Sequence, residues 1–214
     1  LSRMLVGKVL RSPYAHARIK RIDTSKAAAL PRVKAVITGD DLPQLALGVP
    51  GPGGVAPARE YYVSREILAR DKVLYHGHVV AAVAALSSDI AEAAVDLIEV
   101  EYDVLPHVTD PVAAMQPDAV LLHNDLYTQT ATGKATTPSN VAEYLQMGRG
   151  DMERGLAQAE VVIDRTFRTQ TVHQGYLEPD SEAAWVREDG SVIVWANTQT
   201  TFTQRQDLAI IFGI

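Results

Sequence analysis

The pair Thr198-Gln199 is the strongest candidate for chemistry in this sequence. It follows a β-branched and aromatic run, residues 191–196, that predicts a strand, and it precedes a run, residues 200–214, that predicts a helix. A glutamine carboxamide at such a junction is well placed to donate a hydrogen bond to an oxygen atom of a bound ligand. The residues up to Ile214 add no base, metal ligand set or phosphate cradle, so we expect this stretch to hold an incomplete site.

His76 and His78 are separated by one residue, which on a strand places both imidazoles on one face. Two such rings could bind a metal ion together. Gly77 favours a bulge instead, and no third ligand is adjacent in the sequence, so we expect polar residues at a strand corner and no metal site. A small metal-binding protein that uses His76, His78 and His173 stays an alternative.

His173 and Glu178 lie five positions apart in a polar stretch between two expected strands. A histidine and a carboxylate could act as an acid–base pair. A hydrogen-bonded structural pair accounts for the same residues. We therefore assign no catalytic residue.

The composition excludes several classes of protein. A net charge of −6 offers no basic surface for nucleic acid. The absence of cysteine excludes disulfides, iron–sulfur ligation and thiolate zinc within the chain. No apolar run approaches the ~20 residues that a membrane-spanning helix needs. Glycine-rich nucleotide motifs and the nucleophile elbow are missing too. We expect an α+β protein in the cytoplasm, with no membrane and no nucleic acid as partners.

The hydrophobic pattern predicts several short strands with small helices between them. Residues 87–89 should cap a helix that buries Ile90, Ala93, Ala94 and Leu97, and the Pro/Gly-rich residues 44–59 should form a surface loop. Further strands are expected at 4–10, 17–22, 33–38, 72–75, 79–86, 98–104 and 161–171, a hairpin at 183–195, and short helices at 26–30, 111–115 and 151–159. The helix after Gln199 should bury Phe202, Leu208, Ala209, Ile210 and Phe212.

The stretch from Leu10 to Ile19, with the sequence LRSPYAHARI, resembles the large, molybdopterin-binding subunit of the xanthine dehydrogenase and aldehyde oxidase family. The similarity continues at residues 22–25, 33–42, 79–83, 100–106, 150–151, 176–179 and 198–199. Two positions depart from the family pattern. Arg32 stands where a glycine is usual, which should cost only a turn adjustment if its backbone is not left-handed, and His76-Gly77-His78 replaces a Gly-Gln-Pro type of turn.

The resemblance implies a fold and a function. It implies an α/β-hammerhead domain over residues 1–125, a linker over 126–140, and the beginning of a mixed α/β molybdopterin-binding domain over 141–214. Members hydroxylate aldehydes, heteroaromatic rings or related small molecules with oxygen from water. Electrons leave through iron–sulfur clusters and FAD on partner subunits.

Gln199 matches the family position whose amide hydrogen-bonds an oxygen ligand of the molybdenum. The Gly-rich cofactor segment and the catalytic glutamate of the family correspond to positions after Ile214. We therefore expect the chain alone to be inactive, to bind no cofactor, and to require the remainder of its subunit. A non-catalytic scaffold module of a multisubunit complex is the alternative.

Overall fold

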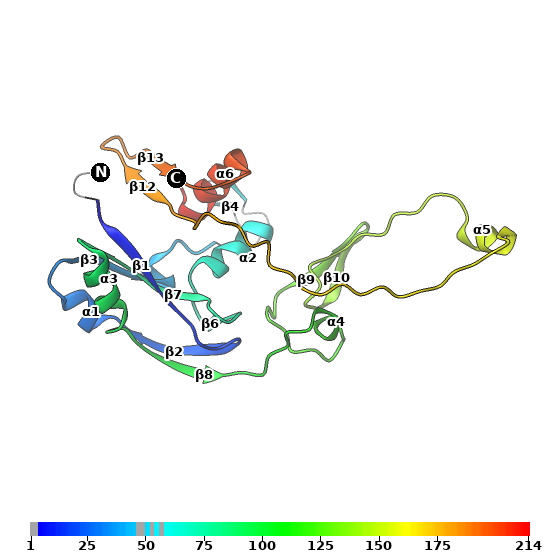
Figure 1. The fold of residues 1–214 in the computed structure, drawn as a ribbon, viewed down its shortest axis with the longest axis horizontal. Helices are drawn as coiled ribbons and strands as arrows, with labels where there is room; N and C mark the ends of the chain where they lie inside the picture. Colours follow the sequence, from blue (N-terminus) through cyan, green and yellow to red (C-terminus); the bar gives the residue numbers. More distant parts are fainter. Residues whose placement is uncertain (1–3, 46–49, 52–53, 56–57) are drawn as a thin grey trace. The chain divides into compact units, whose positions relative to one another are not determined.

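The computed structural model describes residues 4–45, 50–51, 54–55 and 58–214. Its contacts divide the chain into two compact units. Unit 1 comprises the residues up to Tyr144 together with Phe202–Ile214, and unit 2 comprises Leu145–Thr201. The mixture of small sheets and short helices agrees with the predicted α+β class (Figure 1).

Unit 1 contains a three-stranded antiparallel sheet with β7 (Val79–Ala85) at its centre. β1 (Val6–Arg11) and β3 (Val33–Thr38) pair with β7 on either side, and the β1–β7 register shifts between Leu10 and Arg11. β7 reads Val-Val-Ala-Ala-Val-Ala-Ala, and its small apolar side chains allow helices to approach closely. The central strand is therefore the most buried of the three.

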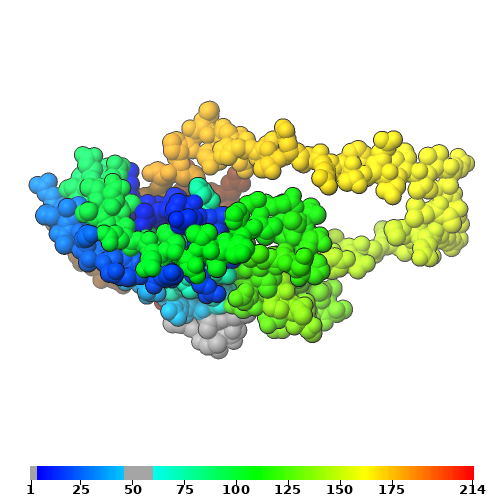
Figure 2. Space-filling model, turned by 90° about the horizontal axis from the view of Figure 1, so that it is seen from below, coloured from blue at the N-terminus to red at the C-terminus, as the bar shows by residue number. Residues whose placement is uncertain are grey.

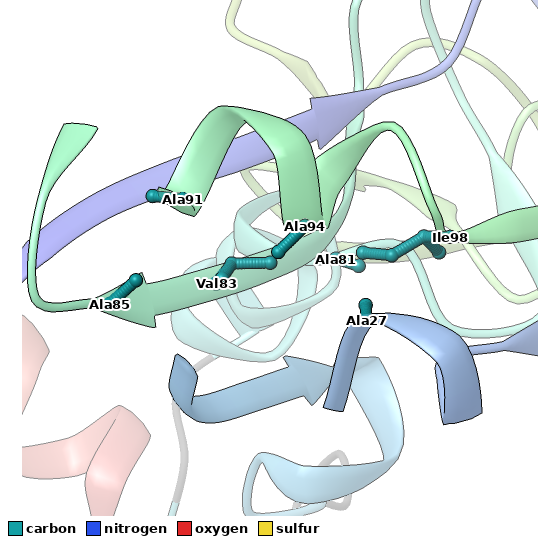
Figure 3. Packing of buried hydrophobic residues seen from close by; sticks show 7 residues of the cluster. All are labelled: Ala27, Ala81, Val83, Ala85, Ala91, Ala94 and Ile98. Carbon is teal, nitrogen blue, oxygen red and sulfur yellow. The ribbon is translucent and has the colours of Figure 1, made fainter. Parts of the chain in front are cut away.

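Two short helices pack against this sheet. α1 spans Ser25–Ala29, and α3 spans Ser88–Val95. The Ser87 hydroxyl caps α3, as predicted, by accepting a hydrogen bond from the Ile90 amide. Ala91 and Ala94 are the fully buried residues of α3, whereas Ala93 is exposed, so the predicted face was partly wrong. Figure 3 shows Ala94 of α3 next to Val83 of β7 in the cluster that forms this core.

A second antiparallel sheet has the order β6-β2-β8. Its strands are β2 (Ala17–Asp23), β6 (Lys72–Val73) and β8 (Glu99–Val104). A smaller buried cluster combines Ala17 and Val73 of this sheet with Ala69 and with Val80 of β7. The strands expected at 4–10, 33–38 and 79–86 therefore belong to one sheet, and those expected at 17–22, 72–75 and 98–104 belong to the other.

The remainder of unit 1 is built from short elements. They are η1 (Gly39–Asp41), β4 (Pro50–Gly51), β5 (Gly54–Val55), α2 (Ala58–Ile67), α4 (Pro111–Ala114), β9 (Tyr127–Thr130), β10 (Gly133–Pro138), β11 (Glu143–Tyr144) and α6 (Thr201–Phe212). The expected loop 44–59 lies partly outside the described residues. Residues 126–140, read as a linker, form β9 and β10, and β9 is the centre of the sheet β10-β9-β11.

The predicted C-terminal helix is present as α6, but its buried face differs from the prediction. Ile211 is buried, and residues 207–210 are half-buried. Phe202 is 78% exposed and Phe212 is 39% exposed, although both were expected to point inward. No helix among the described residues is long and apolar enough to cross a membrane.

Unit 2 contains α5 (Met152–Gln158) and a hairpin of β12 (Ala183–Val186) and β13 (Val192–Trp195). This is the hairpin expected at 183–195, and it turns at Asp189-Gly190, where Gly190 has φ +84°, a conformation that favours glycine. The predicted strand at 161–171 is wrong, because a strand needs a neighbour to receive its hydrogen bonds and the described residues provide none there. Residues 145–175 are all exposed, and Figure 2 shows them, in yellow, as a narrow strip of chain.

Candidate functional site

Gln199 lies between the end of β13 and the beginning of α6, at the junction that the sequence predicted. Its backbone is held by neighbours on both sides. The Thr198 hydroxyl accepts a hydrogen bond from the Thr200 amide at 3.0 Å. The Asn197 amide group lies 3.5 Å from Asp180 Oδ1, which connects the two ends of the hairpin weakly.

The carboxamide of Gln199 is exposed, and among the described residues it makes no hydrogen bond. Its two N–H groups and its carbonyl oxygen are therefore available to a ligand. This arrangement fits a group that presents an oxygen atom as a hydrogen-bond acceptor. A glutamine buried in an apolar interior could not reach such a ligand.

His76 and His78 do not share a face. His76 is exposed, whereas His78 is 0% exposed, because Gly77 turns the chain between them with φ +86°. His78 Nδ1 accepts a hydrogen bond from the Leu74 amide at 3.1 Å, so its proton is on Nε2. Among the described residues, no group of three or more histidine, aspartate or glutamate side chains could hold a metal ion.

Burial lowers the pKa of His78, so the ring is neutral at pH 7. The backbone carbonyls of Glu66 and Arg65 favour the protonated ring, but neither reaches hydrogen-bonding geometry with Nε2. A neutral, buried imidazole of this kind is a structural residue.

His173 and Glu178 are both exposed, and within the part of the chain that the structure describes no hydrogen bond or ion pair joins them. His173 Nδ1 instead accepts a hydrogen bond from the Gly175 amide at 3.0 Å, and its ring lies 5.3 Å from that of Tyr176. The acid–base pair considered from the sequence is therefore not assembled.

Asp151 caps α5, the helix expected at 151–159, by accepting a hydrogen bond from the Arg154 amide at 2.9 Å. Gly150 precedes it with φ +81°, a conformation that favours glycine. The Gly150-Asp151 pair thus forms the turn and the N-cap at the start of α5.

Two family models match the chain one after the other. The model described as aldehyde oxidase and xanthine dehydrogenase, a/b hammerhead domain, matches residues 1–106. The model of the molybdopterin cofactor-binding domain matches residues 134–214. Gln199 lies within the second match.

Curated relatives agree with these matches over nearly the whole chain. A probable xanthine dehydrogenase subunit of Bacillus subtilis is 35% identical over 99% of the chain, which covers 25% of that protein. The carbon monoxide dehydrogenase large chain of Afipia carboxidovorans is 37% identical over 99% of the chain, which covers 26% of it. The chain thus spans about a quarter of the length of these relatives.

Solved structures show the same likeness. A Cu,Mo-CO dehydrogenase matches all of the chain with a TM-score of 0.75 and 37% identity, and the chain covers 26% of it. Quinoline 2-oxidoreductase from Pseudomonas putida 86 matches all of the chain with a TM-score of 0.72 and 31% identity, again over 26% of its own length.

Proposed function

The chain belongs to the aldehyde oxidase and xanthine dehydrogenase family, and from this premise we propose that it forms the front part of a molybdenum hydroxylase subunit. Residues 1–125 would be the α/β-hammerhead domain, 126–140 the connection, and 141–214 the beginning of the molybdopterin-binding domain. The observation that carries the proposal is the ordered pair of family matches, with an exposed Gln199 inside the second.

In the complete subunit, Gln199 would face the molybdenum cofactor and donate a hydrogen bond from Nε2 to one of its oxygen atoms. The bound cofactor would supply oxygen transfer from water and accept the electrons of the substrate. A fixed donor favours the transition state if charge develops on that oxygen. The Thr198–Thr200 hydrogen bond supports this role, because it restricts the backbone on either side of Gln199.

The substrate class would be an aldehyde, a heteroaromatic ring or a related small molecule, and electrons would leave through iron–sulfur clusters and FAD on partner subunits. Two observations on relatives support the existence of partner subunits and a substrate of this class. One of the relatives is named as a subunit and another as a large chain, and similar solved structures include an enzyme named for quinoline. A purely non-catalytic scaffold is not favoured, because these relatives are oxidoreductases.

The experiment is to co-express the complete subunit with its partner subunits and to compare Gln199→Ala with the parent enzyme. We expect kcat to fall by about 100-fold, the effect of removing one donor to a developing oxyanion, while molybdenum content per subunit stays the same. The isolated 214-residue chain should show no turnover.

Gln204→Ala is the matched control, because Gln204 is an exposed glutamine on α6 a few positions further on. It should leave both kcat and molybdenum content unchanged. Full activity of Gln199→Ala with normal molybdenum content would contradict the role of Gln199. Absence of molybdenum from the complete parent subunit would contradict the function itself.

A further inference from the structure

A polar network around Asp125 joins α2 to the segment that leads into β9. The Tyr61 hydroxyl donates a hydrogen bond to Asp125 Oδ2 at 2.7 Å, and the Tyr62 hydroxyl donates to the Asp125 carbonyl oxygen at 2.9 Å. Arg65 Nη1 donates to the Tyr61 hydroxyl oxygen at 2.6 Å and lies 3.9 Å from Asp125 Oδ2. One helix therefore holds both the side chain and the backbone of Asp125.

Ring contacts and partial burial reinforce this contact. Tyr62 packs edge-on against His123, with ring centroids 4.9 Å apart, and against Tyr61 at 5.0 Å. Burial, with the charge of Asp125 as a smaller cause, raises the pKa of Tyr62 to about 12. The Tyr62 hydroxyl therefore stays protonated and able to donate throughout the neutral range.

The segment held by Asp125 is also connected within itself, through Asn140. Asn140 Oδ1 accepts a hydrogen bond from the Leu122 amide at 3.0 Å, and Nδ2 donates to the carbonyl oxygens of Ala114 and Val120 at 3.1 and 2.9 Å. β9 begins two residues after Asp125 and is the centre of the sheet β10-β9-β11. An attachment at Asp125 thus acts on the whole of residues 114–144.

Asp125 lies between the two regions of the chain that the family models match. Neither family model covers residues 107–133, which include Asp125, and the second match begins at residue 134 in β10. We infer that Asp125 is the anchor through which α2 holds the sheet β10-β9-β11, in which the second family match begins. The β10-β9-β11 sheet keeps its protection from solvent only while this anchor is made.

Hydrogen exchange on the 214-residue chain tests the anchor. The reporters are the amides of Leu122, Gln129 and Ser139, which are hydrogen-bonded across the segment at 3.0, 2.8 and 2.9 Å. In Tyr61→Phe and Asp125→Ala we expect these amides to exchange about 10-fold faster, since each change removes a charge-assisted hydrogen bond. The amides of β7 should keep their rates. The double variant should add little to either single one, because both changes break the same contact.

Tyr144→Phe is the matched control, because Tyr144 is 58% exposed in β11 and its hydroxyl has no hydrogen bond among the described residues. Its exchange pattern should equal that of the parent chain. Two outcomes would overturn the inference: unchanged reporter amides in Tyr61→Phe, or an equal acceleration in β7, which would show general destabilisation. Tyr61→Phe removes a single hydroxyl, so the test stands even if Asp125→Ala fails to fold.

Discussion

The ring of Tyr75 stacks on that of His78, with centroids 4.5 Å apart and planes 20° from parallel. The same turn is fastened to the end of β1, because the Ser12 amide donates to the His78 carbonyl oxygen at 2.8 Å and the Gly77 amide donates to the Ser12 carbonyl oxygen at 2.9 Å. The turn between β6 and β7 is therefore built around a buried imidazole, and a charge on that ring would be placed where water cannot reach it.

The stability of unit 1 should consequently fall in mild acid. Burial lowers the folded-state pKa of His78, while an unfolded histidine titrates near its ordinary value of about 6.5. At pH values between these two pKa values, the unfolded chain binds more protons than the folded chain. The free energy of unfolding is therefore highest above about pH 6.5 and decreases as the pH falls toward the folded-state pKa. Urea denaturation between about pH 5 and 7.5, followed by circular dichroism, measures this slope.

His78→Asn should flatten that pH dependence, because it removes the titrating ring and keeps an acceptor for the Leu74 amide. Some slope should remain, since the pKa of His123 is also lowered, by burial and then by the charges of Lys72 and Arg65. His107→Asn is the control, because His107 is exposed. Equal slopes in the parent and His78→Asn would exclude His78 as the source.

Arg32→Gly should stabilise the protein. The arginine was expected to cost only a turn adjustment if its backbone is not left-handed. Arg32 has φ +73°, so its backbone is left-handed. A left-handed backbone costs a residue with a Cβ about 1–2 kcal/mol, which glycine would relieve. Glycine also makes the unfolded chain more flexible, which costs about 0.5–1 kcal/mol of stability, so the net gain should be about 0.5–1 kcal/mol. Thermal denaturation measures it. Lys34→Gly, in the extended strand β3, should destabilise instead, and a loss in both variants would argue against strain at Arg32.

Gly39→Ala should destabilise unit 1 by about 1–3 kcal/mol through overpacking. A Cβ at Gly39 would lie 2.6 Å from the Ala69 carbonyl oxygen and 2.9 Å from Arg70 Cγ. The Ala69 carbonyl belongs to backbone and cannot simply rotate away. Gly7→Ala is the control, because nothing lies within 4 Å of its added Cβ. Equal denaturation midpoints for the two variants would show that the Gly39 site relaxes freely.

Local signals predicted much of this fold, because caps and tight turns depend on residues close in sequence. Ser87 caps α3 as expected, Asp110 and Asp151 cap the helices expected at 111–115 and 151–159, and Gly190 closes the predicted hairpin. The position of Gln199 between a strand and a helix was predicted in the same way, while its role stays a prediction.

Features that depend on distant partners could not be predicted from local pattern. α2 was not predicted, and its contact with Asp125 joins residues 64 positions apart. Residues 161–171 have a strand-like composition, yet strand formation depends on a neighbouring edge that composition does not encode. The inward face of α6 was misplaced for the same reason, because its burial depends on what it packs against.

Asp151→Ala should unfold α5 selectively. α5 has 7 residues and none of them is buried, so its stability depends on local terms such as the Asp151 cap, which is worth about 1 kcal/mol. Backbone Cα chemical shifts of residues 152–158 should move to random-coil values, while those of unit 1 stay fixed. Ser87→Ala is the comparison, because Ala91 and Ala94 bury α3 in the core and should keep it helical without its cap. Helical shifts retained in Asp151→Ala would mean that contacts other than the cap maintain α5.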